Sequence, residues 1–325
     1  MTGPGAELLI SVCVSTRNRS HLLPRLVTAL ENQVLGPDAF EVVVVDDGST
    51  DDTWEVLERL RADSPLKLTL IRNDESQGPA AGRNRAWQAS KAPVVAFTDD
   101  DCEPTSLWLY VGAEAMAEPG RIGVGRVIPH PGQMHLVGPF SYTLWVDEGV
   151  LLWFATANLF YRRTDLEAVG GFDESYRFPA GEDTDLGLRI VEHGAKPTFL
   201  RRALVYHDVR PSSFGAMLRD QRRWQDIPGV VARHPILRQR ALTAGVFWKQ
   251  SHARLLLLFL GVALTPRDRR ALALTLPWLH YRTCVQPLCE GPRRRWAVLP
   301  GAMAIELNEM RHMIRGSIRH RTFVL

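Results

Sequence analysis

Three acidic motifs, far apart along the chain, carry residue types that bind cations and move protons. In chain order they are Asp46 and Asp47, the run Asp99, Asp100 and Asp101, and the pair Glu182 and Asp183. Carboxylates bind divalent metal ions, accept hydrogen bonds and take protons from hydroxyl groups. The motifs therefore predict a metal-assisted reaction at a site that they share.

The run Asp99–101 is the strongest metal candidate. Three consecutive carboxylates repel one another, and a bound cation relieves that repulsion. Mg²⁺ and Mn²⁺ bind through one or two carboxylates, while substrate phosphates fill further positions. His207 follows the apolar run 203–206 and can complete such a ligand set, or can be structural. The alternative for the aspartates is an acidic loop in solvent.

Asp47 and Asp183 suit two other tasks. Asp47 follows an apolar run and precedes Gly-Ser-Thr, so its carboxylate can accept a hydrogen bond from a base or ribose, or can cap a helix. Asp183 falls in the first turn of a predicted helix, whose dipole favours the anion, so we expect it to be ionised at neutral pH. An ionised carboxylate in a cleft can deprotonate a hydroxyl nucleophile. The alternative is that Asp183 only favours the start of the helix.

Two further residues are weaker candidates. Arg83, with Arg72 and Arg85, flanks the segment 78–82 and can face a phosphate or be solvated. Trp224 can stack on a ring or an acyl chain, or can pack against the protein.

The elements that must position these residues alternate between strand-like and helix-like patterns. We predict strands at 8–14, 41–45, 66–71 and 93–98, and helices at 22–30, 53–60 and 79–90. This alternation predicts a parallel sheet, whose ligands gather at the carboxyl ends of the strands. Asp46 and Asp99 stand at two such ends.

The later chain is less regular and then helical. We expect mixed strand and loop at 121–163, a helix at 182–192 ended by Gly194, and helices at 212–225 and 306–318. Residues 1–200 contain 17 Lys and Arg against 29 Asp and Glu, whereas residues 201–325 contain 22 against 7. The basic part suits an anionic partner or simply solvates helices.

Composition excludes several classes of protein. The 325 residues are 45% hydrophobic and 23% charged, which is typical of a globular chain. Four cysteines lack zinc-site spacing, and we find no signal peptide, so we expect a reducing, cytoplasmic location. The longest apolar run, 255–264, is shorter than the about 18–20 residues that span a bilayer.

Taken in order, these motifs resemble the inverting family-two glycosyltransferases with the GT-A fold, of the non-processive bacterial type. The resemblance covers about 8–210 and rests on 10–18, 43–52, 78–84, 97–104, 158–163, 170–174 and 181–194. It implies an α/β fold with a mostly parallel sheet flanked by helices. The domain would occupy 1–210, with a nucleotide-sugar half at 1–104 and an acceptor half at 105–210. A helical, basic extension would follow at 211–325.

The resemblance also implies roles for single residues. The nucleotide sugar would contact Ser15, Thr16, Arg17, Asp47, Arg83, Asp99 and Asp100. A Mg²⁺ or Mn²⁺ ion would be held by Asp101 and Asp99, with His207 as the added candidate. Asp183 would be the base, and the acceptor side would include Asn158, Gly171, Glu182 and Trp224.

The chain departs from processive members of that family. Their QxxRW motif is not matched, because position 220 is Asp and Gln221 is one residue late. We therefore expect transfer of a single sugar from a nucleotide-diphosphate-sugar to a hydroxyl acceptor, lipid-linked or part of a cell-envelope glycan. The extension, with basic residues at 293–295 and 311–321, would suit an anionic membrane at the inner face of the cell or a polyprenyl-phosphate acceptor. It would equally suit a lid or a homodimer surface.

Two other functions remain open at this level. A nucleotidyltransferase shares the acidic sheet edge, but it needs a Gly-rich loop for a triphosphate, and 15–20 contains no glycine. A non-catalytic nucleotide-sugar binder of the same fold would lack Asp183 or Asp101, and both are present. No pattern predicts a nucleic-acid partner.

Overall fold

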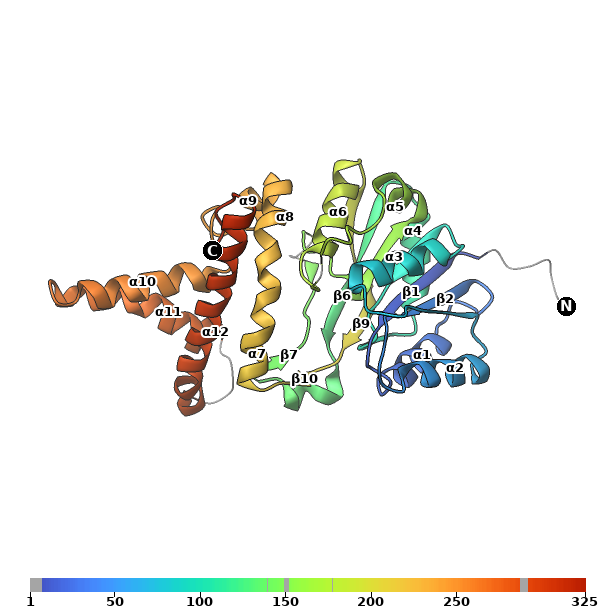
Figure 1. The fold of residues 1–325 in the computed structure, drawn as a ribbon, viewed down its shortest axis with the longest axis horizontal. Helices are drawn as coiled ribbons and strands as arrows, with labels where there is room; N and C mark the ends of the chain where they lie inside the picture. Colours follow the sequence, from blue (N-terminus) through green and yellow to red (C-terminus); the bar gives the residue numbers. More distant parts are fainter. Residues whose placement is uncertain (1–7, 139, 149–151, 177, 287–291) are drawn as a thin grey trace. The chain divides into compact units, whose positions relative to one another are not determined.

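The computed structural model describes residues 8–325 except 139, 149–151, 177 and 287–291. The chain divides into two compact units. The first consists of Met1–Met134 and Thr143–Val209, and the second of His135–Tyr142 and Arg210–Leu325. In Figure 1, the labels from β1 to α6, apart from β7, and the label β9 mark the first unit. The label β7 and the labels from β10 to α12 mark the second unit.

The first unit is built on an eight-stranded sheet. Its strand order is β3-β2-β1-β4-β8-β6-β9-β5, and four of the seven neighbouring pairs are parallel. The strands are β1 Ile10–Thr16, β2 Phe40–Asp46, β3 Leu68–Arg72, β4 Val94–Phe97, β5 Cys102–Pro104, β6 Arg121–Pro129, β8 Leu159–Arg162 and β9 Lys196–His207. The helices are α1 Leu23–Glu31, α2 Thr53–Asp63, α3 Pro79–Ala89, α4 Trp108–Met116, α5 Arg163–Val169 and α6 Glu182–Glu192. This arrangement confirms the predicted α/β fold.

The central strands β2 and β4 are buried along their whole length, and β1 along nearly all of it. Continuous apolar runs are typical of parallel strands that are covered on both faces. Because β1, β2 and β4 are parallel neighbours, their carboxyl ends meet at one edge of the sheet. The acidic motifs at 46–47 and 99–101 follow two of these ends.

The second unit is helical, apart from the short pairing of β7 Ser141–Tyr142 with β10 Arg210–Pro211. Its helices are α7 Phe214–Asp220, α8 Ile227–Arg233, α9 Pro235–Arg240, α10 Gln250–Leu264, α11 Leu276–His280 and α12 Pro292–Arg319. The helix expected at 212–225 is shorter, since a 3-10 turn replaces it from Gln221. The helix expected at 306–318 begins earlier and includes Pro300.

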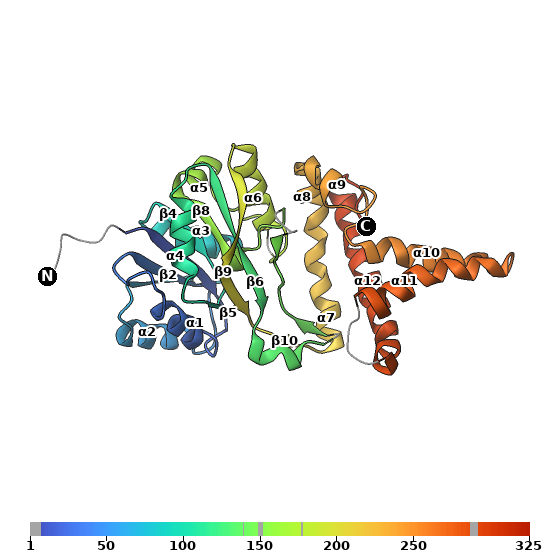
Figure 2. The same cartoon turned by 180° about the vertical axis from the view of Figure 1, so that it is seen from behind.

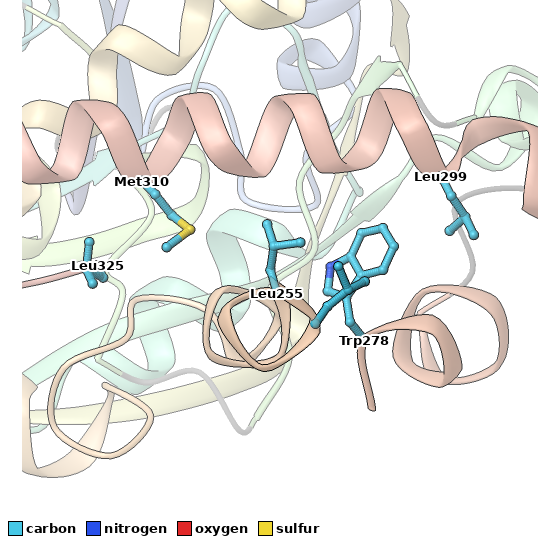
Figure 3. Close-up of a cluster of buried hydrophobic side chains, with 6 residues drawn as sticks. Leu255, Trp278, Leu299, Met310 and Leu325 are labelled. Carbon is cyan, nitrogen blue, oxygen red and sulfur yellow. The ribbon is translucent and has the colours of Figure 1, made fainter. Parts of the chain in front are cut away.

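A hydrophobic cluster accounts for the length of α12. Its buried members are Leu255, Leu258, Trp278, Leu299, Met310 and Leu325. Leu299 and Met310 extend from α12 toward Leu255 of α10 and Trp278 of α11 (Figure 3). This apolar packing stabilises α12 on both sides of Pro300, although a proline in the interior of an isolated helix breaks it.

Two buried carboxylates of α12 lie beside this cluster. Glu309 accepts from Lys249 Nζ at 2.7 Å and lies 3.0 Å from His252 Nε2. Glu306 accepts from Trp278 Nε1 at 2.8 Å and pairs with Arg282. Burial favours the neutral acid at Glu309, but Lys249 and His252 outweigh it and lower the pKa to about 2. The helix therefore depends on two carboxylates that are paired inside the unit, of which Glu309 is held in its ionised form.

We expect Glu309→Gln to lower the free energy of unfolding at pH 7 by about 3 kcal/mol. The ion pairs of the folded chain stabilise the Glu309 carboxylate, and the unfolded chain lacks these pairs. The depressed pKa stabilises the fold above about pH 4.5, and this contribution is lost as the pH falls toward 2. Chemical denaturation at pH 7, 5 and 3 measures both effects. Glu58→Gln, at an exposed carboxylate of α2, is the control. A variant with wild-type stability at pH 7 would contradict the assignment.

Candidate functional site

The loops that follow β1 and β2 are joined by backbone and side-chain hydrogen bonds. Asp47 N donates to Thr16 O at 2.9 Å, Asn18 N donates to Ser49 Oγ at 2.9 Å, and Thr50 N donates to Asn18 Oδ1 at 2.8 Å. Asn18 has a φ of 53°, a left-handed conformation that asparagine adopts more readily than most residues. The two loops therefore form one rigid wall of the site.

The last two residues of β1, Ser15 and Thr16, and the next residue, Arg17, face different surroundings. Ser15 packs so closely on Gly82 of α3 that a side chain at Gly82 would collide with its Oγ. Thr16 is buried and donates its hydroxyl hydrogen to Asp100 Oδ2 at 2.7 Å. Only Arg17 is exposed. A nucleotide at this wall would meet Arg17 most directly.

Asp47 holds the segment 73–78 in place. Its two oxygens accept four hydrogen bonds, from Asn73 Nδ2 and Ser76 Oγ at 2.7 Å and from Gln77 N and Gly78 N at 2.9 Å. Burial opposes the charged form, but the four donors outweigh it and lower the pKa of Asp47. The carboxylate is thus ionised and shapes the wall beside it.

The aspartates after β4 are held by different partners. Asp100 is buried, and Arg19 Nη1 lies 3.3 Å from its Oδ1 and 2.7 Å from Asp101 Oδ2. Burial raises the pKa of Asp100 to about 7, against the lowering effect of Arg19. Asp99 is more exposed and pairs with Arg83 at 3.0 Å. The run is therefore compensated by two arginines within the chain.

Asp101, Cys102 and His207 form the cluster best suited to a metal ion among the described residues. One ligand atom from each lies within 4.8 Å of the others. His207 Nδ1 lies 2.8 Å from Asp208 O, an acceptor, so this nitrogen donates to it, and Nε2 lies 3.5 Å from Asp101 Oδ1. A carboxylate oxygen and an imidazole nitrogen that face each other are ligand types that a divalent cation accepts. Burial raises the pKa of the Cys102 thiol well above its usual range, which makes it the weakest of the three ligands.

Arg83 connects the second and third acidic motifs. Its guanidinium lies 3.0 Å from Asp99 Oδ1 and 2.9 Å from Glu182 Oε1, and 5.9 Å from the ring centre of Phe172. Arg83 and Glu182 are both buried. Arg83 therefore joins the residues that follow β4 to the first turn of α6, because its guanidinium pairs with a carboxylate from each.

Asp183 follows in the first turn of α6, and its Oδ1 accepts from Thr184 N at 2.7 Å. The expectation that the helix dipole keeps it ionised at neutral pH is wrong for the free chain. Burial and the neighbouring charge of Glu182 raise the pKa of Asp183 to about 8, against the lowering effect of Arg83. A carboxyl group with this pKa can exchange a proton with a hydroxyl near neutral pH.

Asn158, which the resemblance assigns to the acceptor side, is buried inside the first unit. Its side chain is 1% exposed, accepts from Trp108 Nε1 at 2.8 Å and donates to the carbonyl oxygens of Arg126 and Ala203. A side chain at Gly125 would collide with it. All of its polar groups are occupied, so it joins β6, α4 and β9.

Gly171 is likewise explained by packing. It has a φ of 70°, and a Cβ there would stand 2.5 Å from Asn84 Oδ1 and 2.9 Å from Trp87 Nε1. Asn84 also accepts from Phe172 N at 2.8 Å and donates to Phe172 O at 2.9 Å. Glycine is needed here because the turn approaches α3 closely.

Trp224 belongs to the second unit, whereas the other candidate residues belong to the first. Its Nε1 donates to Gln221 Oε1 at 2.8 Å, and its ring centre lies 5.8 Å from that of Trp248. Arg223 and Lys249 lie over the ring at 4.9 and 5.1 Å. The ring is therefore part of an aromatic and cationic cluster.

Arg19 is the residue that the sequence analysis missed. Its only local signal is its position three residues after the end of β1, a strand whose carboxyl end lies beside that of β4. In a parallel sheet this position brings it to the acidic run.

The comparisons with known proteins agree with this geometry. The model of the glycosyl transferase family 2 matches residues 11–166, and that of glycosyl transferase family group 2 matches residues 140–286. The chain is 31% identical over 237 residues to validoxylamine A glucosyltransferase of Streptomyces hygroscopicus subsp. limoneus, covering 62% of this chain and 52% of the relative. It is 28% identical over 220 residues to the glycosyltransferase AglE of Haloferax volcanii, covering 66% and 71%. The chain spans about half the length of the curated relatives that it matches first.

Solved structures show the same fold. A mannosyltransferase from Pyrobaculum calidifontis, solved with GDP-Man and Mn²⁺, has a TM-score of 0.59 at 19% identity, covering 97% of this chain and 88% of that chain. Residues 1–349 of S. aureus TarS, solved with UDP, have a TM-score of 0.52 at 20% identity, covering 97% and 92%. The two family models together match residues 11–286, and these solved structures share the GT-A-type sheet, so the chain is similar to the glycosyl transferases of family 2 in both sequence and fold.

Proposed function

We propose that this chain transfers a single sugar from a nucleotide-diphosphate-sugar to a hydroxyl acceptor, with inversion at the anomeric carbon. The observation that carries the proposal is the Arg83 bridge, which brings the proposed base Asp183 beside the Asp99–101 run. A non-catalytic binder has no need for a proton acceptor at this position, and a nucleotidyltransferase would need a Gly-rich loop that 15–20 does not provide.

The donor would lie at the carboxyl edge of the sheet. Arg17 and the wall that Asp47 holds would contact the base, while Asp99 and Asp100 would contact the ribose or phosphate side. Asp101 and His207 would hold the divalent ion, Mn²⁺ or Mg²⁺. When bound, the ion neutralises charge on the leaving diphosphate. The GDP-Man and Mn²⁺ of the Pyrobaculum neighbour, and the UDP of TarS, support this class of donor.

Asp183 would move the proton. Its carboxylate takes the hydrogen of the acceptor hydroxyl, whose oxygen forms a bond to the anomeric carbon as the bond from that carbon to the diphosphate breaks. Attack from the face opposite the leaving group inverts the carbon in one step. Burial and the charge of Glu182 raise the pKa of Asp183, and the charge of Arg83 lowers it, so together they set the pH at which Asp183 ionises.

We propose a lipid-linked or cell-envelope acceptor and a peripheral position on an anionic membrane. No described helix combines the length and the apolar character that a membrane crossing requires. Helix α10 is labelled in Figure 2 and is followed by the segment 265–270. Leu256, Leu257 and Leu260 of α10 are exposed, and so are Arg267, Arg269 and Arg270 of that segment. Apolar faces bordered by cations bind the surface of anionic bilayers.

Asp183→Asn is expected to lower the turnover number by about 10²–10⁴-fold, because the amide cannot take the proton of the acceptor hydroxyl. Donor binding should persist. A panel of UDP-, GDP- and dTDP-sugars, each with Mn²⁺, Mg²⁺ or EDTA, identifies by thermal shift the donor that binds. Release of the nucleoside diphosphate from that donor then measures turnover. Glu192→Gln, at the exposed end of α6, is the control, and a fully active Asp183→Asn variant would exclude Asp183 as the base.

The value of kcat/KM should increase with pH and level off above an apparent pKa of about 8, because only the ionised form of Asp183 accepts a proton. The pH dependence of kcat/KM reports ionisations of the free enzyme. Glu182→Gln removes a neighbouring negative charge, so its profile should shift to lower pH. If the profile of Glu182→Gln were unshifted, the group that titrates would not be Asp183. Glu192→Gln should retain the wild-type profile.

The triple change Arg267→Gln, Arg269→Gln and Arg270→Gln should weaken binding to vesicles that contain phosphatidylglycerol by about a hundredfold, because each arginine contributes about 1 kcal/mol at an anionic surface. Co-sedimentation with these vesicles and with pure phosphatidylcholine vesicles measures the effect. The double change Arg59→Gln and Arg61→Gln, on the exposed face of α2, is the matched control. If both variants bound the anionic vesicles equally, the segment 265–270 would not be part of a membrane-binding surface.

A further inference from the structure

The guanidinium of Arg19 lies inside the acidic run, where it contacts the same carboxylate that is proposed to hold the metal ion. Its Nη1 lies 2.7 Å from Asp101 Oδ2 and 3.3 Å from Asp100 Oδ1. The other oxygen of Asp101 lies 3.5 Å from His207 Nε2. One oxygen of Asp101 is therefore engaged by a cation of the chain itself, and the other faces the imidazole.

The backbone of Arg19 is fixed, whereas its side chain reaches into solvent-accessible space. Arg19 N donates to Thr53 Oγ1 at 3.0 Å, and Leu22 N donates to Arg19 O at 3.0 Å at the start of α1. The side chain remains 27% exposed. It can therefore turn between positions while its anchor stays in place.

This contact relieves a specific electrostatic problem. Asp100 is 7% exposed and is flanked by two further carboxylates, so without a nearby cation its burial would favour protonation more strongly. Arg83 compensates Asp99 on the other side of the run. Arg19 is therefore the counter-charge of Asp100 and Asp101 in the free chain.

We propose that Arg19 competes with the divalent cation for Asp101 and, when the cation binds, moves from Asp101 to the diphosphate of the donor. The proposal rests on the proposed function for the cation and the donor. A guanidinium pairs well with phosphate oxygens, with two donors in a fixed geometry. Because cation binding releases the arginine that the diphosphate needs, each ligand favours the binding of the other.

The competition predicts opposite effects on the two ligands. Arg19→Gln removes the competitor, so Mn²⁺ alone should bind about tenfold more tightly, while UDP or GDP in the presence of saturating Mn²⁺ should bind about tenfold more weakly, in line with a charge-assisted hydrogen bond. Arg19→Lys keeps the charge without the two-pronged geometry. It should bind Mn²⁺ nearly as the wild type does and the nucleotide less tightly.

Two measurements on the full chain test this. Electron paramagnetic resonance of free Mn²⁺ gives the affinity for the metal without nucleotide, and calorimetry with UDP and with GDP in saturating Mn²⁺ gives the affinity for the nucleotide. Arg59→Gln, at an exposed arginine of α2, is the control for the general loss of a positive charge. The increase in melting temperature caused by Mn²⁺ should be larger for Arg19→Gln than for the wild type, which accounts for any loss of stability in the free variant.

The outcomes separate the two levels of the argument. If the wild-type chain binds neither Mn²⁺ nor a nucleotide, the proposed function fails. If the wild type binds both, and Arg19→Gln binds Mn²⁺ with unchanged or lower affinity, the competition is overturned and Arg19 only neutralises the buried carboxylates.

Discussion

One buried cation, Arg83, holds the two halves of the candidate site together. Its guanidinium neutralises Asp99 after β4 and Glu182 at the start of α6, two carboxylates that are far apart in sequence. A buried ion pair contributes modestly as a whole, but the loss of one partner leaves an uncompensated charge. The closeness of the Asp99–101 run to the start of α6 depends on this residue, whose charge also limits how far burial and Glu182 raise the pKa of Asp183.

The same compensation recurs around the other acidic groups. Asp47 is satisfied by neutral donors from the segment 73–78, and Asp100 and Asp101 by Arg19. The different partners have different results. Four neutral donors lower the pKa of Asp47, whereas burial dominates at Asp100 and raises its pKa to about 7. The site thus contains carboxylates with distinct protonation behaviour along one sheet edge, as a reaction that binds a cation and moves a proton requires.

Sequence patterns predicted the strands β1 to β4, the helix over Glu182–Glu192 and the position of Asp46 and Asp99 at one sheet edge, because apolar runs that end in carboxylates are local signals. The partners of polar groups were not predictable in the same way. Asn158 looked available until Trp108, 50 positions away, proved to donate to it, and Arg19 lies 82 positions from Asp101. The raised pKa of Asp183 was not predictable for a related reason. The helix dipole can be inferred from the local sequence, whereas the burial of a side chain depends on the whole fold.

The path of the chain between the units has a practical consequence for dissecting the protein. The second unit is assembled from His135–Tyr142 and Arg210–Leu325, joined where β7 pairs with β10. The chain therefore leaves the first unit, contributes a short piece to the second, and returns before leaving again. A truncation after Val209 would strand β7 without its partner strand, so the modules cannot be exchanged between relatives by a single crossover. A chimaera needs two junctions inside the first unit's span and a third at its end.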